Sequence, residues 1–373
     1  MDIVYIVDFS VTGNSGKQKA TREKASALSN TLGINNFIFI SDKPREGLLS
    51  KIFGKLIFDI TTAIKLLPYN NFIVVQRVLF LPITRFILFL KKSQVVSEYH
   101  ADFREEIPHL NKSVLQKQLL YGAAFFHNFN FKISHGIIYN HPILKAKFDS
   151  IYNKPSIYSY NGSNYKEYYP LSKSRVRNDL NIESERIMFL FLGSVSKWHG
   201  VDYLIDIFNM PEIKAKKNIW LYIVGASDNR FTSELRKRIS NDQTVILPQV
   251  DTSTANRYIN SCDYCLLPVK QIRTSPGSPL KLYDYIACGK PVITQENLLG
   301  YSDEINRYKL GFTTDFTNDR KASKDILSII DNTTDEEIEF FNQNNRAVSI
   351  NEVSWVKRMG YWFQFLKEFE KFR

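Results

Sequence analysis

Short runs of apolar residues alternate with amphipathic, helix-like stretches along the first part of the chain. Runs of this length that are rich in Val, Ile, Phe and Tyr are typical of buried strands. The expected strands are residues 3–7, 36–40, 72–75, 93–96, 136–139 and 156–158. Helical patterns lie between several of them, for example at 19–32 and 116–126. This alternation predicts βαβ units and a doubly wound parallel sheet.

The same alternation restarts after a polar stretch at residues 161–183. The second set of expected strands is 188–192, 220–224, 244–247, 264–267 and 291–294. The chain has 373 residues, a length that suits two domains of ordinary size. We therefore expect an α/β protein with two Rossmann-like halves. Ligands of such sheets bind outside the carboxyl ends of the strands, so we expect the ligand at that edge of the second sheet.

Residues 275–294 carry the most informative local pattern, because they read as a tight loop, a short helix and a buried strand. Ser278 is expected at the N-cap and Pro279 at the first helical position, where a missing N–H costs nothing. Gly289 is expected to supply the left-handed end of the helix, and Pro291 prevents its continuation.

The N-terminus of this expected helix emerges from a Gly/Pro/Ser loop with free backbone N–H groups. Together with the helix dipole, these groups form a seat for a phosphate. Asp284 lies a turn and a half inside the helix, where its carboxylate is well placed to bind two adjacent hydroxyls of a ribose. The spacing therefore predicts a nucleoside diphosphate ligand, and an ordinary helix–strand unit without a ligand is the alternative.

These residues resemble the donor-site helix of GT-B glycosyltransferases, specifically of the large family 4. The usual form there is Glu-x7-Glu, followed by an Ala-Cys-Gly-x-Pro-Val-Ile run. Residues 287–293 match that run closely, Asp284 stands at the second Glu, and Pro276 stands at the first. The resemblance implies a GT-B fold, in which two Rossmann-like domains face each other across a cleft.

The resemblance also implies how the chain is divided. Residues 1–165 are expected to form the N-terminal, acceptor-side domain, and residues 166–354 the domain that binds the nucleotide sugar. The aromatic-rich helix expected at 355–373 would pack back on the first domain, as it does in GT-B proteins.

The loop after the first strand of the second half carries the next strongest pattern. Family members have an Arg and a Lys in this loop that hold the diphosphate, and here Ser194 and His199 occupy their positions. We expect the phosphate charge to be met by Lys197, Arg273 and Lys281 instead. A strand–loop–helix connection without a ligand is the alternative.

The resemblance extends the expected donor site to other glycine turns and loops. Gly225 ends a strand in the second half, and Val250 lies where relatives bring backbone to the nucleobase, with a plain surface loop as the alternative. In the family the first loop lies close to the donor phosphates or the acceptor, and its candidates are Gly13 and Gly16. The expected donor-binding residues are Gly13, Gly16, Gly193, Ser194, Lys197, His199, Gly225, Val250, Arg273, Ser275, Pro276, Gly277, Ser278, Pro279, Lys281 and Asp284. The family is metal-independent, so no metal site is expected.

His100 follows an expected strand in a segment that resembles the Glu-x-His segment of bacterial family members. An imidazole there can act as a general base or bind the transferred sugar. A structural histidine is the alternative interpretation. The catalytic candidates are therefore His100 and Lys281.

The net charge of +11 favours an anionic partner. Because the basic residues are scattered among apolar segments, nucleic acid is not expected as that partner. Residues 45–67 form a basic amphipathic pattern, which predicts either a helix that covers the first sheet or a surface that rests on anionic lipid. No signal peptide or transmembrane span is expected. We expect a cytoplasmic protein, with peripheral contact at the inner face of the cell membrane as a further possibility.

Two of the three cysteines, Cys262 and Cys265, form a C-x-x-C pattern. We place both on one strand, where an odd spacing directs them to opposite faces. A structural role in a reducing compartment is therefore favoured over redox chemistry or a zinc site.

The resemblance implies a metal-independent hexosyltransferase without a cofactor that uses a nucleotide sugar, of the UDP type, as co-substrate. The acceptor would be a glycan or lipid-linked saccharide in surface polysaccharide biosynthesis, and the reaction would be retaining. An inverting reaction with His100 as base stays open, because Pro276 replaces the first Glu. Two other functions stay open: a nucleotide-sugar epimerase, and a non-catalytic GT-B-like protein that binds nucleotide.

Overall fold

A computed structural model describes residues 2–13, 15–32, 37–109, 113–271 and 274–372 of the chain. The chain forms two compact units. The first comprises Met1–Asn161, Arg273–Gly277 and Trp355–Arg373, and the second comprises Gly162–Ile272 and Ser278–Ser354. Each unit contains one six-stranded parallel sheet covered by helices, so the expected α/β architecture with two Rossmann-like halves is confirmed.

The sheet of the first unit has the order β2-β1-β3-β4-β5-β6. Its strands are β1 (Asp2–Val7), β2 (Phe37–Ser41), β3 (Phe72–Arg77), β4 (Gln94–Tyr99), β5 (Gly136–Tyr139) and β6 (Ser156–Tyr158). All neighbouring strands run parallel, for example with Val4 of β1 beside Val74 of β3. The carboxyl ends of these strands therefore meet at one edge of the sheet.

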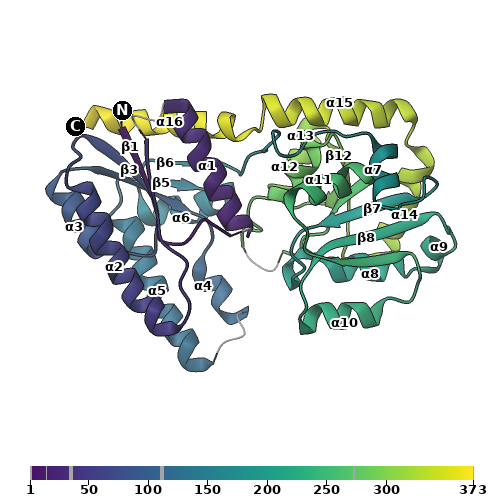
Figure 1. Ribbon diagram of the computed structural model, residues 1–373, viewed down its shortest axis with the longest axis horizontal. Coiled ribbons are helices and arrows are strands. Elements are labelled where there is room, and N and C mark those ends of the chain that lie inside the picture. The colour runs from purple at the N-terminus through teal and green to yellow at the C-terminus, as the bar shows by residue number, and fades with distance from the viewer. Residues whose placement is uncertain (1, 14, 33–36, 110–112, 272–273, 373) are drawn as a thin grey trace. The chain divides into compact units, whose positions relative to one another are not determined.

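Seven α-helices of the described residues belong to the first unit. They are α1 (Gly16–Leu32), α2 (Leu48–Leu66), α3 (Pro82–Leu90), α4 (Phe103–Glu106), α5 (Val114–Lys132), α6 (Pro142–Tyr152) and α16 (Trp355–Glu368). In Figure 1, α1 and α16 lie beside each other on one face of the sheet, and α2, α3 and α5 cover the other face. Right-handed crossovers place these helices on opposite faces, because β2 lies on one side of β1 in the sheet and β3 lies on the other.

The sheet of the second unit has the order β12-β11-β10-β7-β8-β9. Its strands are β7 (Ile187–Leu192), β8 (Ile219–Ala226), β9 (Thr244–Pro248), β10 (Tyr264–Leu267), β11 (Val292–Gln295) and β12 (Gly311–Thr314). The sequence pattern missed β12, because the four-residue GFTT segment has neither the length nor the apolar run of the other strands.

Nine α-helices of the described residues surround this second sheet. They are α7 (Lys173–Asp179), α8 (Val201–Phe208), α9 (Pro211–Lys214), α10 (Arg230–Arg238), α11 (Thr252–Ser261), α12 (Leu280–Ala287), α13 (Ser302–Tyr308), α14 (Asp319–Asn332) and α15 (Asp335–Asn351). Over the described residues, none of the helices in either unit is long and apolar enough to cross a membrane.

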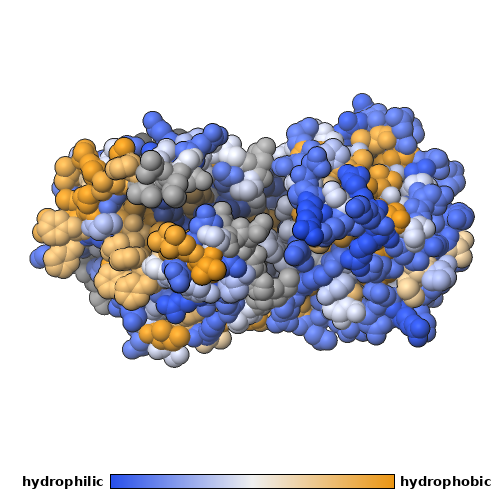
Figure 2. All heavy atoms as spheres, turned by 90° about the horizontal axis from the view of Figure 1, so that it is seen from below, coloured by the Kyte–Doolittle hydropathy of each residue, from blue (hydrophilic) through white to orange (hydrophobic). Residues whose placement is uncertain are grey.

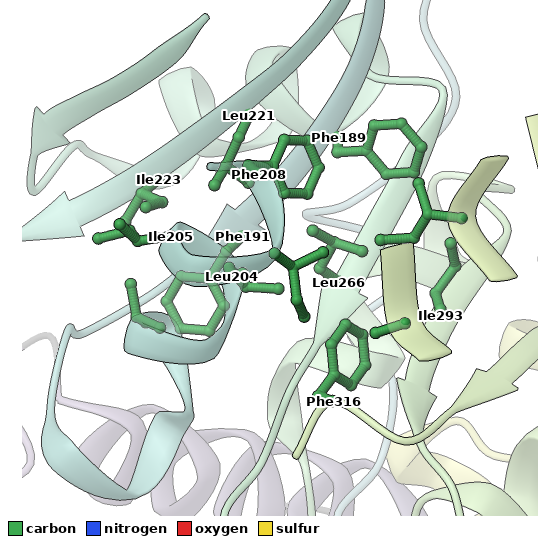
Figure 3. Packing of buried hydrophobic residues seen from close by; sticks show 14 of the residues in the cluster. Phe189, Phe191, Leu204, Ile205, Phe208, Leu221, Ile223, Leu266, Ile293 and Phe316 are labelled. Carbon is green, nitrogen blue, oxygen red and sulfur yellow. The ribbon is translucent and has the colours of Figure 1, made fainter. Parts of the chain in front are cut away.

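Aromatic and aliphatic side chains fill the space between the second sheet and its helices (Figure 3). Phe189 of β7 stacks on Tyr264 of β10 with ring centroids 5.1 Å apart, and Phe208 of α8 meets the edge of Phe189 at 5.5 Å. Offset and edge-to-face pairs of this kind add to the free energy gained from burial. This core fixes the strands and α8, and it therefore fixes the loops at the carboxyl edge of the sheet.

The placement of the two C-x-x-C cysteines on opposite faces of a strand is wrong. Cys262 is the C-cap residue of α11 and precedes β10, so it does not follow the alternation of a strand. The Sγ atoms of Cys262 and Cys265 lie 3.4 Å apart, and both residues are buried. Burial raises the pKa of the Cys265 thiol, which disfavours the reactive thiolate.

Candidate functional site

The helix that the sequence singled out is α12. Its left-handed end is confirmed, since Gly289 has φ 77° and its N–H donates to the Ile286 carbonyl at 3.0 Å. Its expected beginning is wrong by one residue. The N-cap is Pro279, with φ −74° and ψ 112°, so helical geometry begins at Leu280 rather than at Pro279. The extended ψ of Pro279 moves the cap from Ser278 to the proline.

The helix α12 carries two charged residues, Lys281 and Asp284, both in the second unit. Asp284 is buried, with 8% of its surface exposed. Burial lowers the pKa of Lys281 to about 8, and the charge of Asp284 partly offsets this shift. The Lys281 ammonium lies 5.1 Å from the centroid of the Phe191 ring. Lys281 therefore holds its charge in an apolar setting at the carboxyl edge of β7.

Glycines at the ends of β7 and β8 make room for this lysine. A Cβ atom on Gly193 would lie 2.2 Å from Lys281 Cε, and a Cβ atom on Gly225 would lie 2.4 Å from the Gly193 carbonyl oxygen. Both glycines have positive φ angles, 135° and 115°. A residue with a side chain at either position would displace its neighbour and strain the backbone. Gly193, Gly225 and Lys281, from three separate sequence motifs, thus meet at one place.

Tyr285 fastens α12 to the end of β7. Its hydroxyl accepts a hydrogen bond from the Leu192 N–H at 2.8 Å and donates to the Leu192 carbonyl at 3.3 Å. These bonds satisfy both polar groups of the last residue of β7. The helix is therefore held with Lys281 over the glycine turn.

The other expected donor-site residues of the second unit lie in loops at the same edge. Ser194 and Lys197 are exposed, and the Nδ1 atom of His199 lies 2.8 Å from the Ser196 hydroxyl. Val250 is half-buried in the loop after β9. The loop that carries Ser194 packs closely against the backbone at Gly200, because a Cβ atom there would lie 1.5 Å from the Pro268 carbonyl oxygen.

The segment before α12 belongs to the first unit. Ser275 and Pro276 are buried, and Gly277 has φ 81°. Thr274 anchors the segment, since its N–H donates to a carboxylate oxygen of Glu105 at 2.9 Å. Arg273 lies outside the described residues.

His100 lies at the carboxyl end of β4, inside a buried cluster of charges in the first unit. Its Nε2 atom is 2.9 Å from Glu98 Oε2, and the other oxygen of Glu98 is 2.9 Å from Lys24 Nζ. The Tyr5 hydroxyl also donates to Glu98, at 3.2 Å. Lys24 and Glu98 are nearly inaccessible, with 4% and 1% of their side-chain surfaces exposed.

This cluster fixes the charge on each of its members. Burial alone raises the pKa of Glu98, but Lys24 and His100 more than offset that effect and hold it well below its ordinary value. Burial, Arg77 and Lys24 hold the pKa of His100 well below its ordinary value, so its imidazole is neutral near pH 7. With Nε2–H directed at Glu98, the lone pair on Nδ1 faces the Asn140 amide at 3.2 Å. Nδ1 is therefore the atom that could accept a proton.

Sequence reasoning missed Lys24 as part of this cluster. Lys24 lies on α1, and its partner Glu98 lies 74 residues further along the chain, so no local pattern connects them. One signal was available. Lys24 lies in the same buried stripe of α1 as Ala20, Thr21 and Leu28, where a lysine is expected only with a partner.

The first loop, which carries Gly13 and Gly16, is tied to the start of α1. Gly16 is the first residue of α1, and the carbonyl of Gly13 accepts a hydrogen bond from Arg22 Nη1 at 2.5 Å. A Cβ atom on Gly13 would lie 2.4 Å from the amide oxygen of Gln18. Among the residues that the structure describes, no group of three or more His, Cys, Asp or Glu side chains could hold a metal ion.

The sequence of the second unit matches a known family. Residues 172–348 match the model of glycosyl transferases, group 1. This group 1 region contains α12, the ends of β7 and β8, and the loops that carry Ser194 and Val250. No match was found among curated proteins.

Solved structures resemble the whole chain, not only the group 1 region. Sucrose-phosphate synthase from Thermosynechococcus elongatus has a TM-score of 0.72 at 14% identity, over 99% of this chain and 100% of that one. Alr3699/HepE from Anabaena, in complex with UDP-glucose, has a TM-score of 0.71 at 15% identity, over 98% and 99%. WaaG, a glycosyltransferase involved in lipopolysaccharide biosynthesis, has a TM-score of 0.70 at 15% identity, over 96% and 98%. These likenesses show a GT-B fold.

Proposed function

We propose that the protein transfers a sugar from a nucleotide diphosphate sugar to a hydroxyl group of an acceptor glycan or lipid-linked saccharide. The observation that carries the proposal is the position of Lys281, which is half-buried on α12 with its side chain against the glycine turn of Gly193. Desolvation lowers the pKa of this ammonium, and a partly desolvated ammonium favours an anionic ligand, because the ligand replaces the hydration that it has lost. A diphosphate at the N-terminus of α12 would supply that charge.

Each part of the donor has a proposed partner. The carboxylate of Asp284 would accept hydrogen bonds from the ribose hydroxyls, and the backbone of Gly277, Ser278 and Pro279 would line the sugar and phosphate pocket. Lys197 is exposed in the neighbouring loop and would add a second positive charge. The UDP-glucose complex of the Anabaena neighbour supports a UDP-sugar as the donor.

Lys281 would act in the reaction by stabilising the departing diphosphate. Its lowered pKa, about 8, still leaves it mostly protonated at pH 7, and a bound diphosphate raises the pKa further. A fixed positive charge in an apolar setting stabilises developing negative charge more than the same charge in water does. We propose a retaining, metal-independent reaction in which the leaving phosphate helps to activate the acceptor.

His100 gives the inverting alternative a specific form. Its neutral imidazole has one nitrogen committed to Glu98, and Nδ1 would take the acceptor proton after Asn140 yields its hydrogen bond. Exchange of His100 for Gln would then abolish transfer while donor binding persists. If transfer also persists, His100 is not the base and the inverting form is excluded.

A non-catalytic nucleotide-binding protein is the second candidate. Pro276, Ser194 and His199 stand where catalytic members of the resembled family have a carboxylate and two basic groups, and this observation favours it. Such a protein would bind nucleotide but would not consume a nucleotide sugar. An epimerase would convert the donor without any acceptor.

The experiment is a thermal-shift titration with UDP, GDP, ADP and their glucose conjugates, followed by an assay for nucleotide release. We expect one nucleotide to raise the melting temperature of the wild-type protein and of Glu234→Ala, a control at an exposed position of the second unit. Asp284→Ala should lose that response. A flat response of the wild-type protein to every nucleotide would contradict the donor site, and binding without release would favour the second candidate.

We further propose that the acceptor is used in surface polysaccharide biosynthesis and that the protein works at the inner face of the cell membrane. The role of WaaG in lipopolysaccharide biosynthesis supports the kind of pathway. The net charge of +11 supports contact with an anionic surface.

A further inference from the structure

The outer sides of α2, α3 and α5 expose an unusual number of large apolar side chains. Phe89 of α3 is 78% exposed, Phe86 of α3 is 60% exposed, and Leu119 of α5 is 67% exposed. The exposed apolar residues of these three helices are Phe53, Leu56, Ile57, Ile60, Ile64, Ile83, Phe86, Phe89, Leu90, Val114, Leu115, Leu119, Tyr121, Phe125, Phe126 and Phe129. We call their combined surface the α2–α3–α5 face.

The three helices are joined side by side, so this surface is continuous. The carboxylate of Asp59 on α2 accepts hydrogen bonds from the first N–H groups of α3, at 2.9 Å from Ile83 and 2.8 Å from Thr84. Phe80, just before α3, packs on Phe126 and Phe129 of α5 with ring centroids 5.9 and 5.8 Å apart. Figure 2 shows hydrophobic residues gathered at its left, over the part of the first unit that carries these helices in Figure 1.

An apolar surface of this extent is expected to be covered in the working protein. Monomeric soluble proteins rarely expose contiguous apolar patches larger than a few hundred Å². The second unit has no comparable run in its described residues, where the exposed large apolar side chains are Tyr169, Trp198, Leu299 and Phe340. The face is therefore a property of the first unit and not of the chain in general.

The charges around the face select its partner. Residues 60–97 and 107–148 contain no Asp or Glu, and Asp59, the one acidic residue of α2, is only 2% exposed. Lys65, Lys92 and Lys132 are exposed at the ends of the three helices. A second copy of the chain would oppose this positive rim with a like charge, which disfavours self-association. A negatively charged, apolar partner fits both features.

We propose that the α2–α3–α5 face docks on an anionic lipid bilayer. The phenylalanines and leucines enter the boundary between headgroups and acyl chains, and the lysines lie against the headgroup phosphates. No described helix is long and apolar enough to cross the bilayer, so the first unit lies on the surface. This inference deepens the membrane location proposed above, because it names the surface that makes the contact, and its observations come from the first unit alone. A first unit docked in this way would lie at the bilayer surface, where lipid-linked saccharides that could serve as acceptors are found.

The test is co-sedimentation with vesicles, using the full chain. Vesicles of phosphatidylcholine with phosphatidylglycerol provide the anionic surface, and vesicles of phosphatidylcholine alone are the neutral comparison. The variant carries Phe86→Gln, Phe89→Gln and Leu90→Gln. The matched control carries Val356→Gln and Tyr361→Gln on α16, at positions that are 50% and 56% exposed on the opposite face of the sheet.

We expect the wild-type protein and the α16 control to sediment with anionic vesicles, and the α3 variant to partition at least ~10-fold more weakly. Raised salt should weaken the wild-type binding, because the lysine contribution is screened. Equal partitioning of the α3 variant and the wild-type protein would overturn the proposal. The proposal would also be overturned if the wild-type protein did not bind vesicles and instead formed a dimer that the α3 substitutions dissociate.

Circular dichroism of each variant checks that it folds, and the nucleotide thermal shift reports on the second unit separately. Loss of vesicle binding with an intact nucleotide response assigns the effect to the α2–α3–α5 face. A wild-type protein that binds vesicles but no nucleotide would contradict the donor site and leave the membrane proposal standing.

Discussion

Each unit of the protein has a lysine near the carboxyl edge of its sheet whose pKa is lowered by desolvation, and the surroundings of these two lysines differ. Burial lowers the pKa of both Lys24 and Lys281 to about 8. Lys24 has Glu98 at 2.9 Å and shares it with His100. For Lys281, the described residues contain no carboxylate within the 4.0 Å of an ion pair. The charge of Lys24 is thus neutralised inside the first unit.

This difference separates a structural charge from a binding charge. A buried pair whose partners hydrogen-bond each other is complete, and removal of one partner exposes the other to the full cost of burial. A partly desolvated lysine without a carboxylate at ion-pair distance is destabilising in the free protein, and an anionic ligand removes that cost. Lys281 therefore suits the role proposed for it in the donor site, whereas Lys24 holds the Glu98 cluster in place.

The largest effect should follow from breaking the complete pair. Glu98→Gln leaves the Lys24 ammonium buried without its counter-ion, which should lower the free energy of unfolding by about 3–5 kcal/mol. Urea unfolding followed by circular dichroism measures it. Glu234→Gln is the matched control, since it removes an exposed pair with Arg230 and should change stability by less than about 0.5 kcal/mol. A loss of similar size in both variants would show that the Glu98 cluster is not special.

A smaller loss should follow from crowding Lys281. Gly193→Ala places a Cβ atom 2.2 Å from Lys281 Cε at a residue with φ 135°, so we expect about 1–3 kcal/mol of destabilisation from backbone strain, together with weaker nucleotide binding. The control is Gly122→Ala on α5, where a Cβ atom meets nothing within 4 Å. That substitution should stabilise the protein by about 0.5–1 kcal/mol, because alanine favours a helix. Unchanged nucleotide affinity in Gly193→Ala would separate this turn from the donor site.

The sequence predicted those parts of the fold that depend on local patterns. The expected strands are all present, because short apolar runs between polar stretches report burial directly. The end of α12 could be predicted because Gly289 and Pro291 allow few other conformations. Its start could not be fixed to one residue, since Pro279 is compatible with both the N-cap and the first helical position. The difference depends on a single ψ angle.

The sequence could not predict arrangements that depend on distant residues. The contact of Lys24 with Glu98 and that of Lys281 with Gly193 join separate segments of the chain. Cys262 was misplaced because the boundary between α11 and β10 decides its direction. The α2–α3–α5 face was only partly visible in the sequence. Residues 45–67 predicted an amphipathic helix, but the exposure of α3 depends on how it packs between α2 and α5.

The most direct test of the comparison is the affinity for UDP of wild-type protein and Lys281→Met, measured by titration calorimetry between pH 6.5 and 9. A charge-assisted hydrogen bond contributes about 1.5–3 kcal/mol, so the variant should bind roughly 10–150-fold more weakly at pH 6.5. Only protonated Lys281 attracts the diphosphate, so wild-type affinity should fall as the pH rises through about 8, and the difference between the two proteins should shrink. Equal affinity at pH 6.5, or a difference that does not change with pH, would contradict the assignment of Lys281 as the binding charge.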